Sequence, residues 1–138
     1  MAAKDRFHQA VKSALEKDNW KITHDPLYMN FAEVELYIDL GAEKLLGAEK
    51  EGQKIAVEVK TFLNPSAISE FHTVLGQFLN YRFALETEEP DRILYLAIPL
   101  NISETFLARR FVQLILQKYE IKLIIFEPDR EEIVQWKN

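Results

Sequence analysis

A carboxylate and an ammonium group stand two residues apart, as Glu58 and Lys60, in an otherwise apolar stretch. Successive side chains of a β-strand point to opposite faces, so Val57 and Val59 would face a core. Glu58 and Lys60 would share the other face with Ala56. Burying charged groups costs free energy unless they are paired or bind a metal. The two charged residues therefore predict a functional site on this strand. The alternative is a salt bridge on a solvated face, which contributes little to stability.

The chemistry that this pair suggests is metal-assisted cleavage of a phosphodiester. Hard divalent cations such as Mg2+ and Mn2+ prefer carboxylate and carbonyl oxygens as ligands. Glu58 could supply one ligand, Asp39 a second and the backbone carbonyl of Val59 a third. Lys60 would then lie beside the metal, where it could orient the attacking water or stabilise charge on the phosphate. The predicted catalytic residues are therefore Asp39, Glu58 and Lys60.

The two predicted carboxylate ligands meet only if the chain between them bends. A plain hairpin that turns at Glu51-Gly52 would place Asp39 opposite a residue near 64, and not opposite Glu58. We therefore expect a bulge or kink in the first strand of the hairpin. The two candidate positions for it are Gly41 and Gly47.

Polar side chains on the neighbouring helices could complete the site. Gln77 and Tyr81 are one helical turn apart and therefore share a face, and Glu70 lies two turns before Gln77 on the same side. These residues would support the site or contact the substrate, or they are ordinary residues at the edge of a core. His8, on the first predicted helix, is either a further base or ligand or a solvated side chain.

The apolar periodicities predict an α/β protein with a central mixed sheet and helices on both sides. Helices are expected over 5–18, 66–86 and a long stretch that begins at Ser103. Strands are expected over 20–23, 34–38, 54–62, 93–99, 121–126 and 133–136, with the second of these continuing to about residue 50. The residues expected on the inner faces of the last two helices are Ile68, Phe71, Leu75, Phe78, Leu79, Leu107, Phe111, Leu114 and Ile115.

Length and composition limit the classes of function. A chain of 138 residues fits one domain over 1–138, and the absence of cysteine excludes disulfides and thiolate metal sites. No apolar run is long enough to span a bilayer, and the N-terminus has no signal-like core, so a cytoplasmic protein is expected. The net charge of −5 argues against binding nucleic acid over the whole surface, although a local basic groove at Arg82 or Arg109-Arg110 is compatible with it.

The order of these residues resembles the PD-(D/E)XK nuclease superfamily, which has a restriction-endonuclease-like fold. The matching elements are Asp39, then Glu58-Val59-Lys60, then the Gln77-x-x-x-Tyr81 motif of its RecB-like branch. Ile38 stands where that superfamily often has proline, a position that carries no metal ligand. The resemblance implies a divalent-metal-dependent DNA endonuclease in which Asp39 and Glu58 hold the metal.

A second resemblance covers nearly the whole chain. The segments that carry it are Lys4-Asp5-x-x-His8, Asp25-Pro26-Leu27, Ile38-Asp39-Leu40-Gly41-Ala42-Glu43, Lys54-Ile55-Ala56-Val57-Glu58-Val59-Lys60, Leu75-Gly76-Gln77, Pro90-Asp91-Arg92 and Leu94-Tyr95-Leu96-Ala97. With these segments the chain resembles the XisH family, the fdxN element excision controlling factors of heterocyst-forming cyanobacteria. The resemblance implies a role in site-specific DNA excision beside a recombinase and an XisI-like partner.

Two functions are left open at this point. One is an excision factor that cleaves DNA at a metal site. The other is a non-catalytic regulatory or interaction subunit that keeps the nuclease fold and acts through a partner such as the XisI-like protein. A homo-oligomer is also compatible with the chain, because a duplex has two strands to cut.

Overall fold

The computed structural model describes residues 3–28, 30–31, 34–35, 45–63 and 65–138. The helices are α1 (Ala3–Lys17), α2 (Ala67–Glu88), α3 (Leu100–Glu104), the 3-10 turn η1 (Phe106–Ala108) and α4 (Arg110–Lys118). The strands are β1 (Lys21–His24), β2 (Asn30–Phe31), β3 (Val34–Glu35), β4 (Leu45–Lys50), β5 (Gln53–Val59), β6 (Arg92–Pro99), β7 (Leu123–Glu127) and β8 (Glu132–Lys137).

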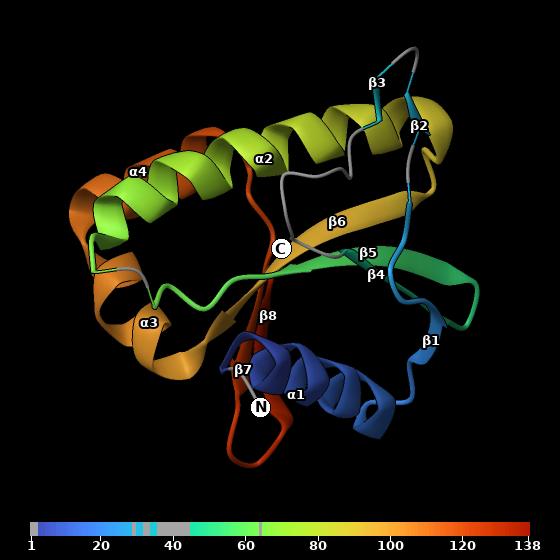
Figure 1. Cartoon of the computed structure of the whole chain (residues 1–138), viewed down its shortest axis with the longest axis horizontal. Helices are drawn as coiled ribbons and strands as arrows, with labels where there is room; N and C mark the ends of the chain where they lie inside the picture. The colour runs from blue at the N-terminus through green and yellow to red at the C-terminus, as the bar shows by residue number, and fades with distance from the viewer. Residues whose placement is uncertain (1–2, 29, 32–33, 36–44, 64) are drawn as a thin grey trace.

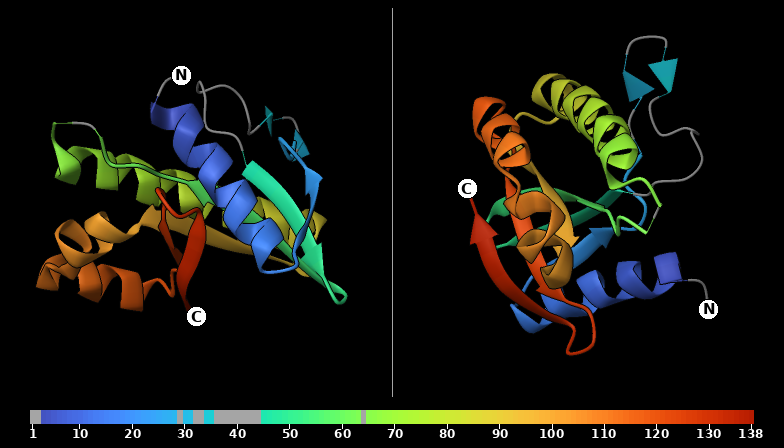
Figure 2. Two further views of the ribbon diagram at one scale, coloured as in Figure 1. Left: turned by 90° about the horizontal axis from the view of Figure 1, so that it is seen from below. Right: turned by 90° about the vertical axis from the view of Figure 1, so that its left-hand side faces the viewer.

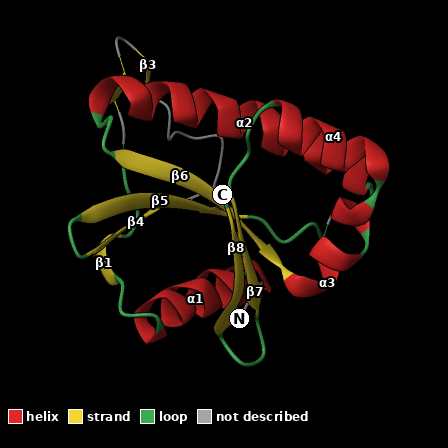
Figure 3. Ribbon diagram, turned by 180° about the vertical axis from the view of Figure 1, so that it is seen from behind, coloured by secondary structure: helices red, strands yellow, loops and turns green. Residues whose placement is uncertain are grey.

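Six strands form one mixed sheet in the order β1-β4-β5-β6-β7-β8, and β2 pairs with β3 separately. The three central strands β5, β6 and β7 run parallel to one another, and the outer pairs are antiparallel. Helices α2 and α4 cover one face and α1 covers the other (Figures 1 and 3). The predicted α/β class, a central mixed sheet flanked by helices, is confirmed, and the arrangement is consistent with a nuclease-like α/β fold.

The sheet separates two apolar clusters, and Figure 2 shows the helices that lie on its two sides. One cluster lies under α2 and α4 and includes Phe71, Phe78 and Leu96, and the other lies over α1 and includes Leu15 and Tyr95. Successive side chains of the central strands point into one cluster and then the other. Both sets are buried because a helix covers each face of the sheet. A charged side chain in the middle of such a strand is therefore enclosed whichever way it points, whereas Lys54 near the start of β5 is exposed.

Helix α1 joins the first part of the chain to the last. Its apolar stripe packs on the sheet beside β8. At the turn between β7 and β8, the Arg6 guanidinium pairs with Asp129, and Lys17 Nζ donates a hydrogen bond to the Arg130 carbonyl at 2.7 Å. These contacts tie the helix to the final hairpin of the sheet.

The hairpin of β4 and β5 turns at Glu51 and Gly52, as predicted. Both have positive φ, 50° and 83°, which suits a tight hairpin turn. Its register pairs Leu45 with Glu58 and Gly47 with Ala56 without a bulge. The kink proposed at Gly47 is therefore wrong for this ladder. Gly41 lies outside the described residues.

The irregularity occurs instead in β1, on the other side of β4. The register between β1 and β4 shifts between Ile22 and His24, so that His24 lies opposite Gly47. A Cβ on Gly47 would come within 2.9 Å of His24 Nδ1, 3.0 Å of His24 Cβ and 3.2 Å of Arg92 Nη1. Glycine at this position therefore allows the imidazole and the guanidinium to pack against the β4 backbone.

Two alanine substitutions should change stability in opposite directions. We expect Gly47→Ala to lower the free energy of unfolding by about 1–3 kcal/mol, because the new methyl group overpacks against His24. Gly76→Ala, at an exposed position inside α2 where a Cβ meets nothing within 4 Å, should raise it by roughly 0.5–1 kcal/mol. Urea unfolding of both variants checks this, and a stabilised Gly47→Ala would contradict the packing.

Helix α2 begins as the sequence predicts. Ser66 is its N-cap, and the Ser66 hydroxyl accepts a hydrogen bond from the Ser69 amide at 3.3 Å. Its inner face differs in part from the prediction, because Ile68 is 39% exposed while Val74 and Tyr81 are buried. No helix within the described part of the chain is long and apolar enough to cross a membrane.

The long helix expected after Ser103 is broken into α3, η1 and α4. The Ser103 hydroxyl bonds back to the Leu100 carbonyl at 2.6 Å and so does not cap a new helix. Arg109 is extended, with ψ of 138°, and this residue separates η1 from α4. Because the helix restarts there, Phe111 and Leu114 are exposed, contrary to the prediction. The residues of α4 that are buried instead are Val112 and Leu116.

Candidate active site

The charged pair lies at the end of β5, with Glu58 in the strand and Lys60 directly after it, on the face toward α2. Ala56, two residues before Glu58, belongs to the cluster under α2, whereas Val57 belongs to the α1 cluster. Glu58 is 0% exposed and Lys60 5%. Lys60 Nζ lies 3.8 Å from Glu58 Oε1. The predicted sharing of one face is confirmed, and the pair is enclosed in the protein and not on a wet strand surface.

Lys60 is held in place from two directions. Its backbone amide donates a hydrogen bond to the Ala97 carbonyl at 3.0 Å, which extends the ladder between β5 and β6 beyond Val59. Its ammonium donates to Gln77 Oε1 on α2 at 3.1 Å. An ammonium positioned by both a carboxylate and an amide is oriented before any ligand arrives, and such preorganised donors stabilise developing negative charge.

The structure places the other predicted site residues on β5 and α2 as follows. Val59 packs its side chain against the α1 cluster, which leaves its backbone carbonyl as the group it would contribute. Tyr81 is 4% exposed and belongs to the cluster under α2. Gln77 and Tyr81 thus lie on the inner side of one helix, and Gln77 contacts Lys60.

Asp39 lies outside the described residues. On the side of the chain that leads to Glu58, the described residues resume at Leu45, six residues after Asp39, and the Cα of Leu45 pairs with that of Glu58. Within the described part of the chain, no three His, Cys, Asp or Glu side chains lie close enough together to hold a metal ion. The described residues therefore contribute one carboxylate, Glu58, to the predicted ligand set, together with the carbonyl of Val59. Both are hard oxygen donors of the kind that Mg2+ and Mn2+ bind.

His8 is in a different environment from Glu58. It lies on α1, which covers the opposite face of the sheet, and its Nε2 is 2.9 Å from Asp25 Oδ1. Lys12 Nζ, one turn later, is 2.7 Å from the other oxygen of Asp25. The structure therefore brings His8 to a carboxylate at the end of β1 and not to the charged pair on β5.

Asp25 should make folding sensitive to acid. Partial burial raises the pKa of Asp25, but hydrogen bonds and charge from Lys12 and His8 outweigh it and hold the pKa below its usual value. The stabilisation is therefore present above about pH 4 and is lost as the pH falls through the lowered pKa. Asp25→Asn should lower the free energy of unfolding by up to about 1 kcal/mol at pH 7 and by less at pH 3. Urea unfolding at the two pH values measures this difference, and an equal loss at both would contradict it.

Two charged residues have buried groups that the sequence did not predict. Arg92 begins β6 and is 5% exposed; its Nη1 donates to the Ile55 carbonyl at 2.9 Å and its Nε to Glu89 at 3.2 Å. The Glu89-x-x-Arg92 spacing was the available signal. On the first turn of α2, Glu70 has one carboxylate oxygen, Oε2, that is buried without a hydrogen-bond partner among the described residues.

The fold and this site together define an α/β protein with a nuclease-like arrangement of sheet and helices and a buried Glu-x-Lys pair at the end of a central strand. A family model described as "XisH protein" matches residues 1–134. The chain therefore belongs to the XisH family.

Two solved structures agree with this assignment. An XisH family protein from Nostoc punctiforme is 51% identical with a TM-score of 0.91, and the match covers 97% of this chain and 100% of that one. A protein described as an fdxN element excision controlling factor, from Anabaena variabilis, is 51% identical with a TM-score of 0.90, covering 97% and 99%. Among curated proteins, none matches significantly.

Proposed function

We propose that this protein is an excision controlling factor that acts in site-specific DNA excision through a nuclease-type site for Mg2+ or Mn2+. The observation that carries the proposal is the pair of Glu58 and Lys60, enclosed at the end of a central strand with the ammonium held by Gln77. Such a buried pair is a poor way to stabilise a sheet, because apolar residues of similar size often stabilise it as well or better. A role in the reaction accounts better for the presence of the pair.

In this proposal the residues have separate tasks. Glu58, the Val59 carbonyl and Asp39 hold the metal ion, which when bound would polarise the scissile phosphate and lower the pKa of water. Lys60 positions the attacking water or stabilises charge on the phosphate. Asp39 lies six residues before the position paired with Glu58, and six residues of extended chain span up to about 20 Å, enough to return a carboxylate to Glu58.

The same residues support placing the chain in the PD-(D/E)XK superfamily. Its acid, Glu-x-Lys and Gln-x-x-x-Tyr elements occur here in that order, and the last two lie at the end of β5 and on α2, where Lys60 contacts Gln77. The relative from Anabaena variabilis is itself described as an excision controlling factor. On this proposal DNA is the substrate, and an XisI-like protein and a recombinase are the partners.

The test is cleavage of supercoiled plasmid and of single-stranded DNA with Mg2+ or Mn2+. We would compare the wild type with Glu58→Gln, which keeps the shape of the side chain, and with Glu104→Gln, an exposed control on α3. The proposal expects cleavage by the wild type and the control, and a loss on the order of 100-fold or more in Glu58→Gln. Cleavage that is unchanged in Glu58→Gln would contradict it.

A second function, in which the protein is a non-catalytic regulatory subunit, is favoured by charge. The net charge of −5 works against phosphate binding. On this alternative the chain acts through its partner, and excision in cells continues when Glu58 is changed to glutamine. Calorimetric titration with Mn2+ separates the two functions, because only the metal site predicts binding that depends on Glu58.

A further inference from the structure

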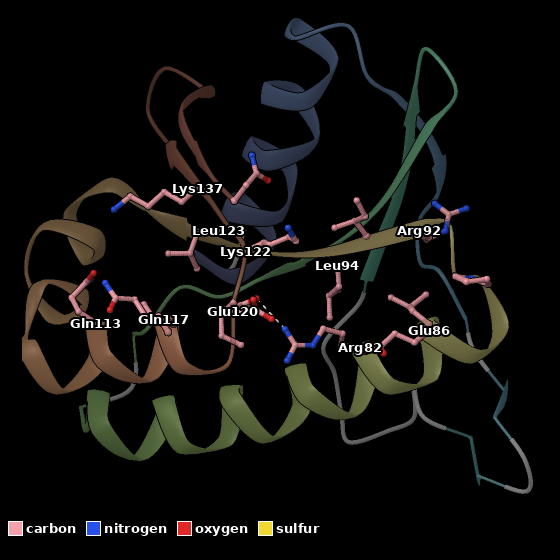
Figure 4. Close-up of a pocket in the computed structure, with 16 residues that line it drawn as sticks. Arg82, Glu86, Arg92, Leu94, Gln113, Gln117, Glu120, Lys122, Leu123 and Lys137 are labelled. Carbon is pink, nitrogen blue, oxygen red and sulfur yellow. Dashed lines mark hydrogen bonds between the residues drawn. The ribbon is translucent and has the colours of Figure 1, made fainter.

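A second concave site lies away from the pair on β5. It is a cavity of about 850 Å3 between α2, α4 and the first residues of β6 and β7, with the end of β8 at its edge (Figure 4). That volume is within the range of small-molecule sites. Glu58, Lys60 and Gln77 do not line it. Its lining includes Arg82, Arg92, Leu94, Gln117, Lys122 and Lys137.

The charge of the cavity is opposite to that of the chain. Four basic side chains line it with only two acidic ones, Glu86 and Glu120, whereas the whole chain has 17 basic and 22 acidic residues. Figure 4 shows Glu86 at the same end as Arg92, while Gln113, Gln117 and Lys137 gather at the other end. A positive site on an acidic protein concentrates anions locally.

The basic side chains of the cavity differ in the number of hydrogen bonds and ion pairs that they form within the protein. Arg92 is committed to Glu89 and to the Ile55 carbonyl. Arg82 donates through Nη1 to the Glu120 carbonyl at 3.0 Å and stacks over Phe78, which leaves most of its five N–H donors for other acceptors.

Lys122 and Lys137 are not committed in this way. Neither forms an ion pair or a side-chain hydrogen bond with any other residue that the structure describes. Lys122 immediately precedes β7, and Lys137 is paired with Leu123 across the last two strands. Donors fixed to strand ends at the edge of a cavity are the kind of group that recognises an anion.

The remaining walls suit an organic body more than a bare ion. The buried side chains of Leu94, Leu116 and Ile121 form the floor, and the amides of Gln113 and Gln117 offer both donors and acceptors at one end. We propose that this cavity binds a nucleoside together with its phosphate. Lys122 and Arg82 contact the phosphate, Lys137 adds long-range attraction, and the nucleoside lies over the leucines toward the glutamines. This nucleoside phosphate is either a free nucleotide or the phosphorylated end of a nucleic-acid strand.

The test follows amide chemical shifts and binding heat of the full chain with three probes. These are a nucleoside monophosphate, inorganic phosphate and a short single-stranded DNA with a 5′-phosphate. The monophosphate should bind with a dissociation constant below about 1 mM and shift amides in β6, β7 and α4. Lys122→Gln should weaken it about tenfold through loss of one charge-assisted hydrogen bond. Lys118→Gln, on α4 but outside the cavity, should bind like the wild type.

The results distinguish a free nucleotide from a strand end, and they can also overturn the proposal. Equal dependence on Lys122 for the monophosphate and the DNA identifies a strand end, whereas binding of the monophosphate alone identifies a free nucleotide. The proposal is overturned if nothing shifts the cavity amides, if the double variant Lys122→Gln/Lys137→Gln binds as the wild type does, or if inorganic phosphate binds as tightly as the nucleotide. Because no cleavage is measured, these results are independent of the metal site at Glu58.

Discussion

Glu58→Leu alone is expected to lower the free energy of unfolding by about 3–5 kcal/mol, whereas Glu58→Leu/Lys60→Met together should lower it by less than about 1 kcal/mol. The single change leaves a buried ammonium without its carboxylate, 3.8 Å away in the wild type. The double change replaces both charges with apolar groups of similar volume. Chemical denaturation of the wild type, both single variants and the double variant measures the coupling between the two sites.

The double variant also separates stability from function. It should fold and melt near the wild-type temperature, yet it has neither the carboxylate nor the ammonium that the proposed chemistry needs. We therefore expect it to lose Mn2+ binding and cleavage while keeping the fold. A double variant as unstable as the single variants would show that the pair is needed for packing, and one that still cleaves DNA would exclude the pair from the reaction.

Phe78→Ala is expected to lower the free energy of unfolding by about 3–5 kcal/mol. Phe78 is 1% exposed in the centre of the cluster that attaches α2 to the sheet, and alanine would leave a cavity there. The matched control is Phe83→Ala on the same helix, where the ring is 61% exposed and the loss should be under about 1 kcal/mol. Urea unfolding measures both, and comparable losses would mean that α2 is not held by its inner face.

This substitution should also affect the site, because Phe78 follows Gln77 directly. If α2 is held less firmly on the sheet, the 3.1 Å contact between Gln77 and Lys60 is held less firmly too. We expect Phe78→Ala to reduce any metal-dependent cleavage at temperatures well below its unfolding midpoint, and Phe83→Ala to leave it unchanged. Equal activity in the two variants would argue that Gln77 does not position Lys60.

The part of the site at the end of β5 could be predicted because it depends on two local sequence patterns, and each pattern involves only a few residues. The turn at Glu51 and Gly52 set the hairpin register, which pairs Leu45 with Glu58, and strand alternation put Glu58 and Lys60 on one face. The contact between Lys60 and Gln77 could be expected only loosely from helix periodicity. Its distance depends on how α2 packs on the sheet, which no local pattern contains.

The break before α4 shows why the second half was harder to predict. Leu107, Phe111 and Leu114 have spacings that suit one continuous amphipathic helix. The extended backbone at Arg109 restarts the helical phase, so Leu107 is buried in η1 while Phe111 and Leu114 are 54% and 51% exposed. A periodicity measured across a break combines two phases, and it therefore assigned both residues to the wrong face.

The link between α1 and the β7–β8 hairpin has a consequence for biosynthesis. A ribosome releases the chain from its N-terminus, so Ala10, Val11 and Leu15 leave the tunnel before the strands they pack against. Asp129 and Arg130, which contact Arg6 and Lys17 of α1, are synthesised 123 and 113 residues after their partners. Until the β7–β8 hairpin has been synthesised, the apolar side of this helix faces solvent or a chaperone, and its docking onto the sheet follows the synthesis of that hairpin.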